Sequence, residues 1–202
     1  MESIVHGIIL AFGLILPLGV QNVFVFSQGA TQPKLARALP ATITAGLCDT
    51  LLILLAVFGV SVIVLQFEWL RLGLMIAGIL FLLYIGYVIW RAEPAPTGTN
   101  QALPIQQQII FALSVSLLNP HAILDTVGVI GTSALKYTGL EQILFTIACI
   151  SVSWIWFFGL TAAGRIMKKL DGKGKIMNTF NKCSALFIWG TAIYLMIGLN
   201  SV

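Results

Sequence analysis

From Ser3 to Pro33 the chain reads SIVHGIILAFGLILPLGVQNVFVFSQGATQP, a run of 31 residues without Asp, Glu, Lys or Arg. A second run of the same length, from Pro94 to Leu124, also lacks these four residue types. A helix of about 20 apolar residues is long enough to cross the hydrocarbon core of a bilayer, which is about 30 Å thick. The two uncharged runs therefore indicate segments that lie in a membrane.

The composition extends this conclusion to the whole chain. Hydrophobic residues make up 58% and charged residues 9% of its 202 residues, whereas soluble domains carry roughly 25% charged residues. The mean hydropathy is +0.99, and the polar connections are too short to form a domain of their own. Six apolar stretches predict spans: Ile4–Ser27, Ala41–Leu65, Trp69–Trp90, Ile109–Ser133, Leu140–Gly164 and Cys183–Asn200. We therefore expect an all-α integral membrane protein with six transmembrane helices in a single domain over residues 1–202.

The basic residues are divided unequally between the two sides of such a bundle. If the six helices alternate in direction, nine Lys and Arg residues fall on one side and two, Arg71 and Lys136, on the other. Short loops rich in Lys and Arg stay in the cytoplasm. The sequence therefore predicts that both termini lie on the non-cytoplasmic side. We interpret the positive charge as a topology signal that meets anionic lipid headgroups, and we expect no nucleic-acid partner.

Two segments resemble each other, GLILPLGVQNVFVFSQG from Gly13 and SVSLLNPHAILDTVGVIG from Ser114. Superposing Pro17 on Pro120 places Asn22 opposite Asp125. Each half of the chain holds three spans, an odd number, so the second half enters the membrane in the opposite direction. Helices interrupted at matching positions of two inverted repeats mark the substrate site of many secondary transporters.

The sequence therefore predicts two inverted three-helix repeats. Their expected bounds are residues 1–92 for the first repeat, 93–107 for the loop and 108–202 for the second repeat. We expect the helices to break at Pro17, Asn119 and Pro120, because proline removes a helical hydrogen bond and leaves a carbonyl free to line a cavity.

Two acids, Asp49 and Asp125, lie inside predicted spans, where each costs about 2.5 to 3.5 kcal/mol near a helix centre. Every basic residue near a span lies close to a helix end, so neither acid has a basic partner at its own depth. We expect them to be protonated, bonded to neutral partners, or facing a path that a cation enters. Their predicted depths differ by about 12 Å, too far for one small ion to touch both. We interpret both acids as substrate-binding or coupling residues.

Neutral polar residues near the acids extend the candidate site. Gln21 and Asn22 follow the predicted break in the first span, and amide side chains serve there either as ligands or as bonds between helices. The match with Asp125 favours the ligand role for Asn22. His121 lies four residues before Asp125, and it is either a proton relay or a buried hydrogen-bond donor.

Other chemistries lack their signatures in this sequence. The motifs G-x-S-x-G and H-E-x-x-H are absent, so we expect no enzyme. The three cysteines form no C-x-x-C pair, and no cluster of His, Cys and carboxylates of the kind that transition metals select is present. We expect neither a cofactor nor a metal site. An exporter of another small cation, such as a divalent metal, stays open as the alternative function.

Three stretches carry a resemblance to a known family. They are PLGVQNVFVFSQG from Pro17, AGLCDTLLI from Ala45 and LLNPHAILDTVGVIG from Leu117. With these motifs and its hydropathy, the chain resembles the LysE/ArgO family of basic amino acid exporters over nearly its full length. Related exporters of neutral amino acids have P-G-P-N where this chain reads PLGVQN, so the resemblance favours the basic amino acid branch.

The resemblance implies export of L-arginine, L-lysine or both from the bacterial cytoplasm across the inner membrane. Such a substrate needs acids for its cations, here Asp49 and Asp125. It also needs donors for its carboxylate, here Gln21, Asn22 and the interrupted helices. The resemblance also implies that the membrane potential or a proton gradient drives export. Moving one positive charge outward costs about 2.3 kcal/mol per 100 mV, so export of the cation alone requires a high internal concentration or exchange for protons, with Asp125 and His121 as candidate carriers. The preference between the two substrates, the coupling ion and a homodimer stay open.

Overall fold

The computed structural model describes residues 1–16, 19–59, 68–91, 102–119, 122–123, 126–170 and 175–199. Within these ranges the chain is helical and contains no strand. Four residues named above, Pro17, Pro120, His121 and Asp125, lie outside the described residues.

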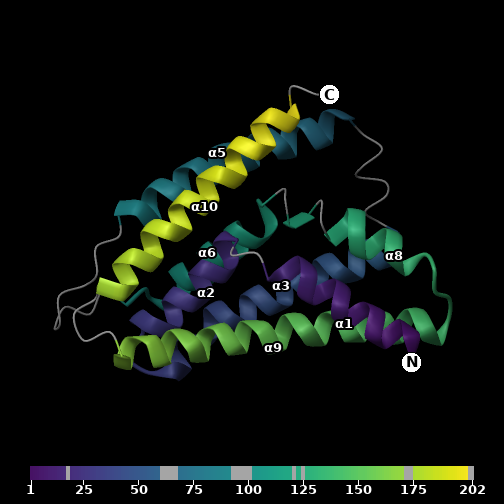
Figure 1. The fold of residues 1–202 in the computed structure, drawn as a ribbon, viewed down its shortest axis with the longest axis horizontal. Helices are drawn as coiled ribbons and strands as arrows, with labels where there is room; N and C mark the ends of the chain where they lie inside the picture. Colours follow the sequence, from purple (N-terminus) through teal and green to yellow (C-terminus); the bar gives the residue numbers. More distant parts are fainter. Residues whose placement is uncertain are drawn as a thin grey trace.

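The described residues form seven longer helices (Figure 1). They are α1 (Glu2–Ile15), α2 (Val20–Thr31), α3 (Leu39–Val57), α5 (Glu68–Arg91), α6 (Ile105–Leu117), α9 (Leu140–Leu170) and α10 (Lys175–Leu199). The described ranges also contain the 3₁₀ turn η1 (Leu35–Arg37), the π-helical turn η2 (Thr126–Gly131) and the short helix α8 (Thr132–Ala134). Each predicted span thus contains at least one helix.

Not every helix is a membrane span by length and composition alone. Among the described residues, α3 and α9 are each long and apolar enough to cross a bilayer. Together α1 and α2 pass the same test as one pair, although they are bent by 80° relative to each other. The part of the chain that the structure describes therefore holds two or three such spans.

The first and fourth predicted spans are interrupted. In the first, α1 ends at Ile15 and α2 begins at Val20. In the fourth, α6 ends at Leu117, Asn119 is not helical, and helical residues are again described at 122–123 and in η2. Both interruptions fall in the stretches where the two similar motifs carry their prolines.

Several helix ends differ from the sequence prediction. The predicted polar connection 165–182 is mostly helical, because α9 continues to Leu170 and α10 begins at Lys175. Likewise α6 begins at Ile105, inside the predicted loop 93–107. Lysine is a good helix former and is favourable near a helix C-terminus, so the basic end of α9 prolongs the helix beyond the apolar span.

Arg165 gives this extension of α9 a packing role. Its guanidinium Nη1 donates to the carbonyl of Gln32 at 2.9 Å, and Nη2 donates to that of Pro33 at 3.0 Å. These carbonyls directly follow α2, where a cationic donor satisfies groups that a helix end leaves free.

The helices form a bundle with a pair of helices beside it (Figure 1). The long helix α9 packs along α1, α2 and α3, and α6 packs on α3. The pair α5 and α10 lie side by side and meet the bundle through an apolar cluster. That cluster includes Val20, Leu82, Ile85, Val115 and Ile188.

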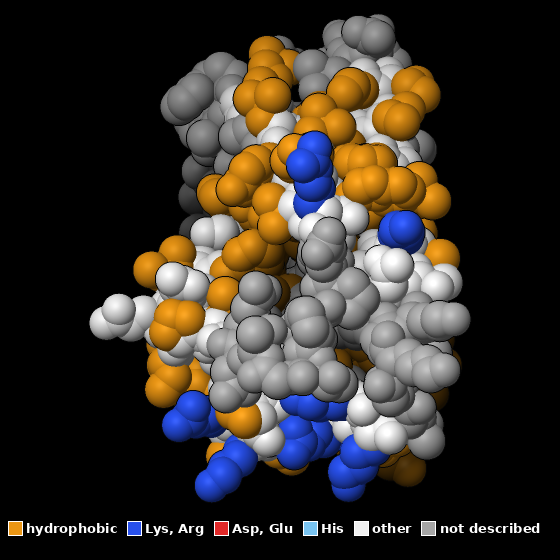
Figure 2. Space-filling model, turned by 90° about the vertical axis from the view of Figure 1, so that its left-hand side faces the viewer, with side chains coloured by type: hydrophobic (Ala, Val, Ile, Leu, Met, Phe, Trp, Pro, Cys, Tyr) orange, Lys and Arg blue, Asp and Glu red, His pale blue; other side chains and the backbone are white. Residues whose placement is uncertain are grey.

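The start of α1 and the end of α10 lie at the same end of the molecule, on the right in Figure 1. The opposite end holds the ends of α2, α5 and α9. Figure 2 looks at that opposite end and shows several Lys and Arg side chains, with no Asp or Glu among the described residues on this face. Among the described residues, the charged side chains seen on this end are therefore basic.

Close backbone contact fixes α2 against α9. A Cβ atom added at Gly164 of α9 would meet the Phe26 carbonyl, and one added at Gly29 of α2 would meet the Thr161 carbonyl. Thr161 also shares a hydrogen bond of 2.7 Å with Thr42 of α3. Small residues and hydroxyl bonds of this kind typically join helices in a membrane.

Candidate functional site

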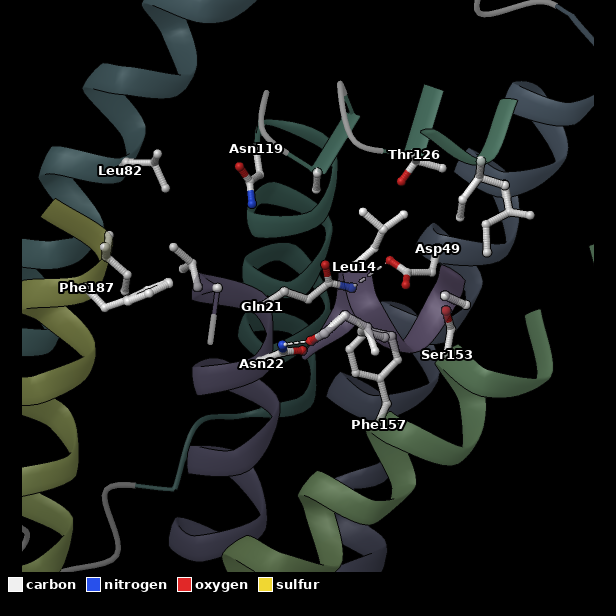
Figure 3. A pocket seen from close by; sticks show the side chains of 18 residues that line it. Leu14, Gln21, Asn22, Asp49, Leu82, Asn119, Thr126, Ser153, Phe157 and Phe187 are labelled. Carbon is white, nitrogen blue, oxygen red and sulfur yellow. Dashed lines mark hydrogen bonds between the residues drawn. The ribbon is translucent and has the colours of Figure 1, made fainter. Parts of the chain in front are cut away.

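A cavity of about 150 Å³ lies where the α5 and α10 pair meets the bundle (Figure 3). Its polar lining consists of Gln21, Asn22, Asp49, Asn119, Thr126 and Ser153, and its apolar wall includes Ile53, Leu82, Phe157, Phe187 and Ile188. Since one water needs roughly 10 to 15 Å³ on this measure, the cavity holds about ten or more non-hydrogen atoms. That size suits a free amino acid.

Both interrupted spans contribute to this cavity. Gly19 to Asn22, at the start of α2, lie on one side, and Asn119 and Thr126, which flank the second interruption, lie on another. The two similar motifs, far apart in the sequence, therefore meet at one place in the fold.

Asp49 presents its carboxylate to the cavity from the middle of α3, and its side chain is half-buried. Gln21 Nε2 donates to Asp49 Oδ1 at 3.1 Å, and the Ser153 hydroxyl of α9 also interacts with this carboxylate. No Lys or Arg among the described residues forms a salt bridge with it. A carboxylate has about four lone-pair positions, so neutral donors leave part of Asp49 open to a cation.

The Gln21 side chain bridges α2 and α3. Besides its bond to Asp49, Nε2 lies 3.4 Å from the carbonyl of Ala45, one turn earlier on α3. The residue is buried, with 8% of its surface exposed. The sequence predicts that Gln21 belongs to the site, and its amide contacts the Asp49 carboxylate directly.

Asn22 holds the interruption of the first span together. Its Nδ2 donates to the carbonyl of Ile15, the last residue of α1, at 2.7 Å, and its Oδ1 accepts from Trp156 Nε1 at 3.3 Å. Helix ends leave carbonyls without a partner inside the helix, and Asn22 supplies one. The side chain thus connects α1, α2 and α9 while also lining the cavity.

These bonds bear on how a substrate carboxylate would be held. Both amide nitrogens, of Gln21 and Asn22, donate to protein acceptors here, so their expected role as carboxylate donors stays a prediction. The start of α2 offers other donors. Gly19 precedes it without a side-chain cap, and the first N–H groups of a helix have no partner inside it.

Sequence reasoning missed three residues of this region, Thr126, Ser153 and Trp156. Ser153 and Phe157 are four residues apart, so they share one face of α9, and both line the cavity. A polar residue at that spacing within an apolar span is a signal that points to them. The indole of Trp156 has no such signal, because its bond to Asn22 depends on how α9 is rotated.

Two expectations concern groups of titratable residues. The described residues hold no group of three or more His, Cys, Asp or Glu side chains that could bind a metal ion. Asp125 and His121 lie outside the described residues, although Thr126, the residue after Asp125, lines the same cavity as Asp49.

Curated relatives share almost the whole chain. A putative amino-acid transporter, YisU of Bacillus subtilis (strain 168), is 56% identical over 200 residues, which cover 98% of this chain and 91% of the relative. The arginine exporter protein ArgO of Escherichia coli (strain K12) is 30% identical, over 94% of this chain and 91% of the relative. ArgO of Klebsiella pneumoniae (strain 342) is 31% identical with the same coverage. No solved structure matches the chain significantly.

The family model gives the same assignment. The model described as "LysE type translocator" matches residues 12–199, which include α2, α3, α9 and the whole cavity lining except Ala11. The resemblance seen in the three sequence motifs is thereby confirmed, and the chain belongs to the LysE family of membrane translocators.

Proposed function

We propose that this protein exports basic amino acids, L-arginine or L-lysine, from the bacterial cytoplasm across the inner membrane. The observation that carries the proposal is Asp49, whose carboxylate faces an amino-acid-sized cavity and has only neutral partners among the described residues. Relatives named as arginine exporters support the substrate class.

The cavity offers a partner for each part of such a substrate. Asp49 suits a cationic group, because a buried charge needs an opposite charge or several hydrogen bonds. The hydrocarbon part of the substrate suits the apolar wall, which includes Leu82 and Ile188. The substrate carboxylate suits the start of α2, where the helix dipole favours an anion.

For the architecture, we propose six transmembrane spans in one domain, arranged as two inverted repeats. Two features support it. The interrupted helices of the two similar motifs meet at the cavity, and the start of α1 and the end of α10 lie at the same end (Figure 1). The basic residues at the opposite end favour a cytoplasmic location for that end, which places both termini outside.

For energy coupling, we propose exchange of the substrate for protons. Outward movement of a cation opposes an inside-negative potential, and an entering proton would offset that cost. Asp125 and His121 are the proposed carriers, because their side chains titrate or relay protons and they follow the second interruption in sequence.

The test is counterflow in proteoliposomes that contain the purified protein. We expect labelled arginine or lysine to exchange, and we expect Asp49→Asn to lower exchange at least about tenfold, since hydrogen bonds to charged groups contribute about 1.5 to 3 kcal/mol. Glu141→Gln, which removes an exposed carboxylate in the first turn of α9, is the matched control and leaves exchange unchanged.

Two outcomes contradict the proposal. Full exchange by Asp49→Asn would remove the proposed cation site. Flux of a divalent metal without exchange of either amino acid would favour the alternative exporter of small cations.

A further inference from the structure

We infer that Gln21 accepts a hydrogen bond from the cationic group of the substrate side chain, with Asp49 holding the amide in the orientation this requires. The inference rests on the proposed function, because it assigns a role at the same cavity. It differs from the role that the sequence suggests for Gln21, in which the amide donates to the substrate carboxylate.

The orientation of the amide follows from its two neighbours on α3. Nε2 lies 3.1 Å from Asp49 Oδ1 and 3.4 Å from the carbonyl oxygen of Ala45. Both neighbours are acceptors, and an amide nitrogen carries two N–H donors. With Asp49 ionised, turning the amide over would place Oε1 against two oxygen acceptors, so these two contacts favour the orientation in which Nε2 faces α3.

As a consequence, Oε1 is left for the cavity. Figure 3 shows this oxygen turned away from Asp49, toward the space where Asn119 and Thr126 lie. Among the described residues Oε1 of Gln21 has no hydrogen-bond partner. It is also not one of the fully enclosed polar atoms that lack a partner, so part of its surface is accessible. It is therefore an acceptor that is open to the cavity on a side chain otherwise buried.

An amide oxygen beside a carboxylate selects substrates by their N–H donors as well as by their charge. Ammonium and guanidinium groups are all donors, with three and five N–H bonds respectively, so one such group reaches both acceptors. A quaternary ammonium keeps its attraction to Asp49 and has no N–H for Oε1. We therefore expect Gln21 to discriminate protonated amines and guanidinium groups from cations without N–H donors.

A purely structural role for Gln21 makes a different prediction. If the amide only joins α2 to α3, its removal lowers the affinity for all substrates by the same factor. Gln28 provides the matched control. It lies two turns further along α2, is buried, and does not line the cavity. Its Oε1 accepts a hydrogen bond of 3.1 Å from Gln32 Nε2.

The test measures competition against labelled arginine exchange by lysine and by Nε-trimethyl-lysine. The ratio of the inhibition constant of trimethyl-lysine to that of lysine is determined for each protein. This ratio is then compared among the wild type, Gln21→Met and Gln28→Met. We expect the wild type to favour lysine, Gln21→Met to reduce that preference by about tenfold, and Gln28→Met to leave it unchanged. A steric effect of the three methyl groups is present in all three proteins and cancels in the comparison.

Gln21→Leu also removes the acceptor oxygen, and it tests the inference if Gln21→Met does not insert. An acceptor role predicts that Gln21→Leu loses the preference for lysine over trimethyl-lysine by about the same factor. A donor role toward the substrate carboxylate predicts an unchanged preference, because both amino acids carry that carboxylate.

An unchanged ratio in Gln21→Met, or in Gln21→Leu if Gln21→Met does not insert, would overturn the inference while leaving the proposed function standing. A wild-type protein that exchanges neither arginine nor lysine would overturn the proposed function, and this inference with it.

Discussion

Asn22→Ala is the change that tests how the interruption of the first span is held. The side chain is buried and donates to the Ile15 carbonyl at 2.7 Å, a short bond between α2 and the end of α1. It also accepts from Trp156 Nε1 of α9 at 3.3 Å. Truncation to Ala leaves one carbonyl and one indole N–H without these partners.

The magnitude follows from the two bonds. Hydrogen bonds between membrane helices average about 0.6 kcal/mol and reach about 1.7 kcal/mol. Two such bonds at a buried site predict that Asn22→Ala lowers the free energy of unfolding by about 1 to 3 kcal/mol. Asn22→Asp keeps the acceptor for Trp156 and loses the donor to Ile15, so we expect at least half of that loss.

The assay is unfolding of the purified protein in mixed micelles by increasing SDS, followed by tryptophan fluorescence. Trp156 lies edge-on to Phe12 of α1, with ring centroids 6.4 Å apart, so separation of α1 from α9 changes its surroundings. Gln28→Ala, another amide truncation on α2, calibrates the loss for a buried amide away from the cavity. Unfolding of Asn22→Ala at the wild-type SDS concentration would refute the proposal that Asn22 stabilises the contacts of α2 with α1 and α9.

Three further changes test other parts of the structure. Gly164→Ala is expected to lower the melting temperature and Gly159→Ala to leave it unchanged, because only the first Cβ would meet the backbone of α2. Labels at either terminus are expected to react only from outside the cell and a label between Lys168 and Lys175 only from inside; termini on opposite sides would contradict six spans. Asp125→Asn is expected to retain some substrate exchange and lose export against a gradient, with a milder effect for His121→Gln; equal loss of both activities would exclude proton transfer there.

The apolar pattern predicted the helices well because burial in lipid is a property of each segment by itself. Runs without charge identified a helix in every predicted span, and the prolines near positions 17 and 120 identified where two of those spans are interrupted. Helix ends were less predictable. The basic end of α9 remains helical past the apolar span, and its Arg165 bonds to the chain after α2, a contact between distant residues that the residue pattern does not show.

The site could be predicted in part for the same reason. Asp49 is conspicuous in the sequence because an acid inside a span is costly wherever it lies. Its contact with Gln21, 28 residues earlier, depends on how α2 and α3 are rotated about their axes. The residue pattern does not fix that rotation, so the partners of Asp49 and the orientation of the Gln21 amide required the three-dimensional arrangement.

Binding of arginine and lysine to the purified protein tests the cation site most directly, because it needs neither a gradient nor a defined topology. We expect the wild type to bind at least one of the two, and we expect Asp49→Asn to raise the dissociation constant at least about tenfold. Glu141→Gln is expected to bind like the wild type. Equal affinity of Asp49→Asn and wild type, or no binding of either amino acid by the wild type, would contradict a basic amino acid site at Asp49.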